Sequence, residues 1–176
     1  MKTKDLGYIA LSAALLTVSA WIAVPIGTIP ITLQTATLFL VAGLLGLKRA
    51  VLATLAYILL GGIGVPVFAG FLGGFSVLLS PTGGYIVGFL AISLIVGWYT
   101  EKKRGEKAWG LAMAMFFALL LCYAFGTVWF MAVLGTDTGF FGAIALCVLP
   151  YLPFDILKLI LSLFLLQKLK KIIKTT

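Results

Sequence analysis

Two opposite charges, three residues apart, stand in the middle of a long apolar stretch near the C-terminus. The stretch covers residues 140–169, and Asp155 and Lys158 interrupt it. An isolated charge near the centre of a bilayer costs about 2.5–3.5 kcal/mol on insertion scales. Residues three apart lie on one face of a helix, so the carboxylate and the ammonium can reach each other. Charged groups in such a position are candidates for binding a polar ligand.

The charged pair belongs to a longer polar stripe. Tyr151 is four residues before Asp155, and Ser162 is four residues after Lys158, so all four side chains share one face of the predicted helix. We interpret this stripe as a candidate ligand-binding site. The alternative interpretation is a self-neutralising pair that serves only packing.

The composition indicates the class of protein. Of the 176 residues, 62% are hydrophobic and only 10% are charged, whereas about a quarter of the residues in a soluble domain are charged. We therefore expect one membrane domain, residues 1–176, in a lipid bilayer. The net charge of +8 would suggest a nucleic-acid partner in a soluble protein. Here the basic residues gather at the ends of apolar segments, so we expect no nucleic acid.

Several classes of chemistry are excluded by residues that the chain lacks. Histidine and asparagine are absent, which removes histidine-based proton relays, histidine metal sites and Ser–His or Cys–His hydrolases. No Gly-x-x-x-x-Gly-Lys-Ser/Thr phosphate loop occurs, so ATP hydrolysis by that route is excluded. We expect no enzymatic activity, no metal and no cofactor. Cys122 and Cys147 lie in apolar segments, and we assign them no function.

Six apolar segments predict an all-α integral membrane protein with six transmembrane helices. The expected helices cover residues 6–24, 32–46, 50–63, 85–99, 108–134 and 140–169. The connection 25–31 is expected to be a short turn. Pro150 and Pro153 should bend the sixth helix, because proline removes a backbone donor and its ring clashes with the preceding turn.

The basic residues indicate the orientation of these helices. With six spans, 12 of the 13 basic residues fall on one side of the membrane: Lys2, Lys4, Lys48, Arg49, Lys102, Lys103, Arg104, Lys107, Lys168, Lys170, Lys171 and Lys174. The positive-inside rule then predicts that both termini are cytoplasmic. The thirteenth, Lys158, lies about 15 Å from the inner boundary at 1.5 Å per helical residue, near the middle of the bilayer.

Two further segments are candidates for a binding pocket. Gln34 lies beside threonines at the start of the second helix, where it is either a helix cap or part of a polar pocket. The connection 64–84 carries no charge, six glycines and two prolines. Irregular backbone of this kind is tolerated at membrane depth where it is buried in protein or lines a cavity. We expect side chains such as Phe68 and Phe75 to line a pocket, the alternative being a lid that only packs.

The first helix carries a face of small residues. Ala10, Ala13, Ala14 and Thr17 lie at helical spacing, and Ala10-x-x-x-Ala14 is a small-xxx-small pattern. Such a face lets another helix approach closely. The spacing is equally compatible with a contact to a partner subunit and with internal packing.

Four short blocks resemble the BioY family, the biotin-specific S components of energy-coupling factor (ECF) transporters. They are PITLQT at 30–35, GGIGVPVF at 61–68 with AG and GG after it, PTGGY at 81–85 and PFDILK at 153–158. They follow the family's order and span nearly the whole chain. One position departs from the pattern: Phe71 stands where a second glycine is expected after Ala69-Gly70, which can alter the shape of this loop.

The resemblance implies six helices in an S-component-like bundle, with an outward-facing biotin site, in a prokaryotic plasma membrane. It also implies docking onto a transmembrane coupling subunit with two cytoplasmic ATPases, so that ATP is hydrolysed on other chains. Ala10 and Ala14 match the alanine-rich first-helix motif that contacts the coupling subunit. The candidate substrate-binding residues are Asp155, Lys158, Gln34, Tyr85, Phe68, Gly74 and Tyr151.

The chemistry of biotin suits the charged pair. Asp155 is expected to accept from a ureido N–H, while Lys158 donates either to the ureido oxygen or, in a second pose, to the carboxylate. The alternative functions are a stand-alone facilitator or secondary transporter that uses the pair as a coupling relay, an S component for another small vitamin, and a membrane enzyme.

Overall fold

The computed structural model describes residues 3–26, 29–103, 108–134 and 139–175. Within these ranges the chain is mostly helical, with one two-stranded hairpin. The elements in chain order are α1 (Thr3–Trp21), β1 (Ala23–Ile26), β2 (Ile29–Thr32), α2 (Gln34–Leu45), α3 (Leu47–Gly62), the 3₁₀ turn η1 (Ala69–Phe71), α4 (Phe75–Leu78), α5 (Gly83–Lys103), α6 (Ala108–Leu134), α7 (Gly139–Cys147) and α8 (Leu152–Thr175).

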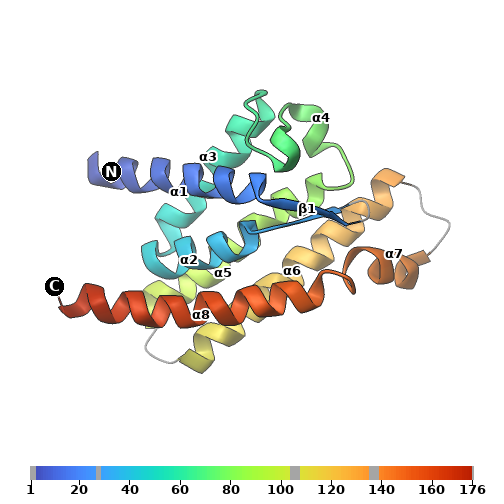
Figure 1. Cartoon of the computed structure of the whole chain (residues 1–176). Coiled ribbons are helices and arrows are strands. Elements are labelled where there is room, and N and C mark those ends of the chain that lie inside the picture. The colour runs from blue at the N-terminus through green and yellow to red at the C-terminus, as the bar shows by residue number, and fades with distance from the viewer. Residues whose placement is uncertain (1–2, 27–28, 104–107, 135–138, 176) are drawn as a thin grey trace.

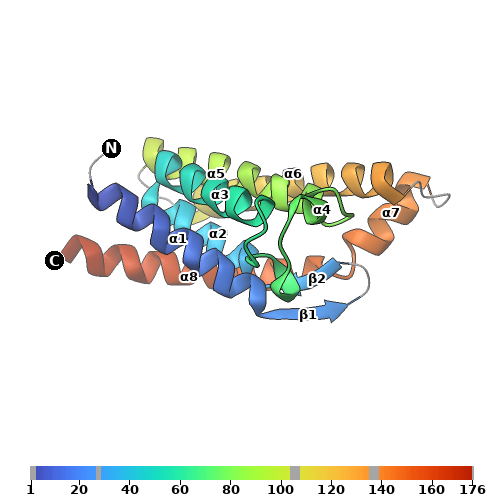
Figure 2. The ribbon, with the colours of Figure 1, turned by 90° about the horizontal axis from the view of Figure 1, so that it is seen from above.

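The long helices form an elongated bundle. Figures 1 and 2 show both ends of the chain at one end of this bundle, with the β-hairpin and α7 toward the other. Within the described residues, α5 and α6 are each long and apolar enough to cross a membrane, and α7 with α8 makes a third candidate if they count as one broken span. The structure therefore has two to three candidate spans by length and composition.

The sixth helix is bent, as its two prolines predict, but it is also broken into two helices. Instead of one helix over 140–169, α7 ends at Cys147 and α8 begins at Leu152, with a bend of 55° between them. Pro150 lies in the break, where it has no N–H to continue the helix. Pro153 lies in the first turn of α8, where helices tolerate proline because that N–H has no intrahelical partner.

The connection after the first helix is also more ordered than the predicted turn. Its described residues form the antiparallel strands β1 and β2, with Ala23 opposite Thr32 and Pro25 opposite Pro30. Because neither proline has an N–H, this pair can only occupy a non-hydrogen-bonded position of the ladder. The helix before the hairpin covers 3–21 rather than 6–24, and the helix after it begins at Gln34 rather than at 32.

Glycines allow α5 and α6 to pack closely. A Cβ atom added at Gly84 would lie 2.2 Å from the Cβ of Trp129, and one added at Gly126 would lie 2.3 Å from the ring of Tyr85. Small residues of this kind let helix backbones approach each other in membrane proteins.

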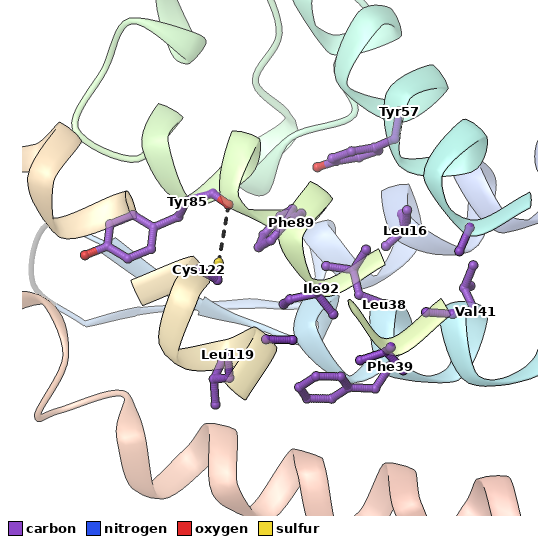
Figure 3. Packing of buried hydrophobic residues seen from close by; sticks show 14 of the residues in the cluster. Leu16, Leu38, Phe39, Val41, Tyr57, Tyr85, Phe89, Ile92, Leu119 and Cys122 are labelled. Carbon is purple, nitrogen blue, oxygen red and sulfur yellow. Dashed lines mark hydrogen bonds between the residues drawn. The ribbon is translucent and has the colours of Figure 1, made fainter. Parts of the chain in front are cut away.

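The apolar core draws on most of the long helices, among them α2, α5 and α6. Figure 3 shows Leu38, Phe39, Ile92 and Leu119 among the apolar side chains there. All four are at most 1% exposed. The core supports one side of the cavity described next.

Candidate ligand-binding site

A cavity of about 350 Å³ lies beside this core. Its walls come from β2, from the starts of α2 and α8, from α3, α5, α6 and α7, and from the connection between α3 and α5. The volume is within the range of small-molecule sites, which are mostly apolar with a few convergent polar groups. The described residues place two such polar groups on the wall.

The first polar group is centred on Asp155, whose carboxylate receives donors from three helices. Its Oδ1 accepts from Thr35 Oγ1 and from Lys158 Nζ, both at 2.8 Å, and its Oδ2 accepts from Tyr123 O–H at 2.5 Å. Asp155 is 6% exposed, so this charge is stable only because it is paired and hydrogen-bonded.

Lys158 brings donor capacity to the same wall. The salt bridge to Asp155 is 2.8 Å long, and the lysine side chain is 12% exposed. An ammonium group has three N–H donors. Among the contacts described, the bond to Asp155 uses one of them, which leaves two for a ligand in the cavity.

The second polar group is centred on Gln34. Its Nε2 donates to the hydroxyl oxygen of Tyr57 at 2.7 Å, and its Oε1 accepts from Thr32 Oγ1 at 3.0 Å. Leu33, the residue before α2, makes no side-chain cap bond, and the N–H of Gln34 donates to Thr32 Oγ1 at 3.4 Å. The Gln34 amide is therefore not the helix cap, and Gln34 lies on the cavity wall. The Tyr57 hydroxyl accepts here and keeps its own proton to donate.

Aromatic side chains form much of the remaining wall. Phe68 is 1% exposed and lies edge-on to Tyr57, with 5.5 Å between the ring centroids. It occupies the space that a side chain at Gly61 would fill. The Tyr85 hydroxyl lies 3.2 Å from Thr127 Oγ1. Figure 3 shows Tyr57 on α3 and Tyr85 on α5, and Tyr151 lines the wall at the break before α8.

Six of the seven sequence-predicted binding residues thus lie on the cavity wall, and Gly74 does not. Gly74 instead is the N-cap residue directly before α4, has φ +103° and donates its N–H to the carbonyl of Gly61 at 2.7 Å. Only glycine adopts this backbone conformation without strain. Its role in the structure is to hold the connection against the end of α3.

The other predicted groupings are divided between the cavity and its surroundings. Ser162, the last member of the polar stripe, contacts the Ala36 carbonyl at 3.4 Å and lies outside the cavity wall. On α1, Ala10 and Ala14 are exposed, whereas Ala13 is buried and its carbonyl accepts from Thr17. The expected face of four small residues is therefore split, and only its two AxxxA members point outward.

The cavity residues that the sequence prediction did not name include Thr35, Tyr57 and Tyr123. Each places a hydroxyl inside an otherwise apolar helix. Polar groups within a membrane segment are usually bonded to something, so the hydroxyls were a usable signal. Their partners were not visible in the sequence, because Thr35 and Asp155 are 120 residues apart.

Comparisons with known proteins agree on one family. A family model described as the BioY family matches residues 1–175. The biotin transporter BioY of Thermotoga maritima is 41% identical over 159 residues, covering 90% of this chain and 91% of the relative. The probable biotin transporter BioY of Pyrococcus horikoshii is 38% identical over 170 residues, covering 97% and 98%. A crystal structure of the S-component for biotin from an ECF-type ABC transporter superposes with a TM-score of 0.86 and 26% identity, covering 97% of this chain and 95% of that one.

The hydrogen bond from Tyr123 to Asp155 leads to a prediction about stability. In Tyr123→Phe, one carboxylate oxygen loses its donor while the ring and its packing remain. We expect the free energy of unfolding to fall by about 1–3 kcal/mol, the usual cost of an unsatisfied buried polar group. Thermal unfolding of the purified protein measures this. Tyr8→Phe is the matched control, because Tyr8 is 47% exposed. Equal unfolding midpoints for the two variants would contradict the prediction.

Proposed function

The chain belongs to the BioY family, and from this premise we propose that it binds biotin and takes it up as the substrate-specific subunit of an ECF transporter. The names of the relatives and of the solved structure support this proposal. The observation that carries it is the buried Asp155–Lys158 pair on the wall of a cavity of small-molecule size.

The polar groups of biotin match those on the cavity wall. The ureido ring has two N–H donors and one carbonyl, the fused thioether ring is apolar, and the tail ends in a carboxylate. A carboxylate has about four acceptor positions, and three donors already bind Asp155. In the proposed complex the fourth accepts a ureido N–H. Lys158 donates to the ureido oxygen in one pose and to the tail carboxylate in the other, while the aromatic wall contacts the rings.

We expect both members of the pair to contribute to affinity. Asp155→Asn should weaken biotin binding by about 1.5–3 kcal/mol, roughly 10- to 150-fold, which is the usual contribution of a charged hydrogen bond. Lys158→Ala should cost at least as much, because it also leaves Asp155 without its counter-charge in a buried site. Equilibrium binding of labelled biotin to the purified variants measures both effects. Lys168→Ala is the matched control, since Lys168 is exposed on the same helix.

The double variant separates a binding role from a structural one. If the pair served only packing, each single variant would lose stability and the neutral double variant would recover it. Normal biotin affinity in a well-folded double variant would remove the pair from the binding site. Gln34 and the connection between α3 and α5 would then be the remaining candidates.

The proposal includes six membrane spans with both termini in the cytoplasm. In this arrangement α7 and α8 together form the sixth span, and the basic residues lie on the inner side. The two ends of the chain at one end of the bundle are in keeping with an even number of spans (Figure 1). Lys2, Arg104, Lys107 and the outer turn with Asp137 belong to this prediction and lie outside the described residues.

Thiol labelling of intact cells tests the topology. A membrane-impermeant maleimide added outside should label Asp137→Cys and leave Arg104→Cys unlabelled. The unmodified chain provides the background, because Cys122 and Cys147 are 2% and 1% exposed. The opposite pattern would overturn the orientation.

The proposed partners are a transmembrane coupling subunit and two ATPase subunits. Ala10 and Ala14 are exposed on α1, and a side chain added at Gly7 would meet nothing within 4 Å. Small exposed residues on one helix allow a partner helix to come close. These observations support the proposal that α1 contacts the coupling subunit.

Ala14→Trp should reduce assembly with the energising module and biotin uptake, while the isolated protein still binds biotin. The reason is steric, since an indole in place of a methyl group keeps the two helices apart. Co-purification of the subunits, uptake and binding measure the three effects. Leu15→Trp is the control, because Leu15 is also exposed but lies about 100° further around the helix. Loss of binding along with assembly would show that this face packs internally.

A further inference from the structure

The connection between α3 and α5 contributes a tight turn, residues 68–72, to the cavity wall. The N–H of Phe68 donates to the carbonyl of Leu72 at 2.9 Å, which closes the turn. Phe68, Ala69 and Leu72 all line the cavity. The position of this turn therefore decides whether that side of the cavity is covered.

The tip of the turn has an unusual backbone conformation. Gly70 has φ +71° and Phe71 has φ +59°, and among the described residues Phe71 is the one non-glycine residue with positive φ. This conformation is strained for a bulky side chain. Phe71 is 63% exposed, so burial of its ring does not compensate for the strain.

The ring of Phe71 instead stacks on Trp21, the last residue of α1. The ring centroids are 4.9 Å apart and the planes are inclined by 29°. The indole N–H of Trp21 also donates to the carbonyl of Pro66 at 3.0 Å. One tryptophan thus holds the covering turn at its tip and the connection at its start.

A second tryptophan holds the other end of the connection. The indole N–H of Trp129 on α6 donates to the carbonyl of Ser80 at 3.1 Å. Trp129 also stacks on Phe125 and packs against Gly84. The Trp21 contact is exposed and the Trp129 contact is partly buried, so the two anchors differ in how easily they open.

We propose that the Trp21–Phe71 stack is a latch that keeps the 68–72 turn over the cavity. Ligand enters and leaves when this stack opens, while the Trp129 anchor holds the far end of the connection in place. Trp21 and Phe71 are positioning residues, since they act through Phe68 and Leu72 and do not line the cavity. For biotin as the ligand, the latch rests on the function proposed above.

Two buried thiols report on the latch without any ligand. Cys122 and Cys147 line the cavity and are nearly inaccessible, so N-ethylmaleimide reaches them faster when the turn opens. We expect Phe71→Ala, Phe71→Gly and Trp21→Leu to raise the alkylation rate about 3- to 10-fold, the range that corresponds to the loss of one aromatic stack. Mass spectrometry of the intact protein over time measures the rate.

The control is Phe75→Ala, which removes a 65% exposed ring from the same connection and should leave the alkylation rate unchanged. Phe71→Gly guards against misfolding, because glycine adopts the positive φ without strain. The double variant Trp21→Leu/Phe71→Ala should react no faster than the faster single variant, since both substitutions remove the same stack. Alkylation at the wild-type rate in folded Phe71→Gly and Trp21→Leu would overturn the latch.

Exchange of labelled biotin distinguishes failure of the latch from failure of the proposed function. With biotin as the ligand, the latch variants should release it about 3- to 10-fold faster in a chase with unlabelled biotin, and bind it faster, so that Kd changes by less than about 3-fold. Unchanged release rates in variants that bind biotin would overturn the latch. A wild-type protein that fails to bind biotin would overturn the proposed function, and the alkylation rates would still decide the latch.

Discussion

The structure depends on the convergence of three helices on one buried carboxylate. The carboxylate of Asp155 on α8 accepts hydrogen bonds from Thr35 on α2, from Tyr123 on α6 and from Lys158 on its own helix. A charge in an apolar bundle without such donors would be strongly destabilising. The requirement for all three donors therefore fixes α2, α6 and α8 relative to one another. The cavity lies where these contacts keep the helices together around a space that no side chain fills.

The break before α8 supplies a further stabilisation of the same carboxylate. Because the helix restarts at Leu152, Asp155 lies in the first turn of α8. The N-terminal end of a helix carries a partial positive charge that favours a carboxylate. In an unbroken helix over 140–169 the same residue would lie in the middle, without this benefit. The break also brings Cys147 and Tyr151 onto the cavity wall.

Phe71 stands where the family pattern has a glycine, and the structure shows what the phenylalanine contacts. A glycine would be the natural residue for φ +59° at that position. The phenylalanine introduces backbone strain and in return gains the stack on Trp21. The loop of this chain is thus tied to α1 by a contact that a glycine could not make. The stack thus makes the 68–72 turn more rigid, while the positive φ of Phe71 raises the conformational energy of the backbone there.

The amino-acid sequence by itself determined the membrane class and the Asp155–Lys158 pair. These features follow from composition and from spacing within one helix, so no knowledge of distant contacts was needed. Most helices also followed from apolar runs, although the ranges 6–24, 32–46, 50–63 and 85–99 were misplaced by two or three residues at their starts.

Only the tertiary structure decided which hydroxyls complete the site. The bonds from Thr35 and Tyr123 to Asp155 join residues 120 and 32 positions apart, and such pairings leave no local pattern. The hairpin likewise depends on cross-strand pairing, whereas the bend at Pro150 was predicted from the sequence, because proline cannot continue a helix. For Gly74 the sequence prediction and the structure differ. Its sequence block predicted a pocket residue, whereas in the structure it has positive φ and lies directly before α4. Local chemistry thus identified the charged centre, and long-range packing supplied its partners and its cover.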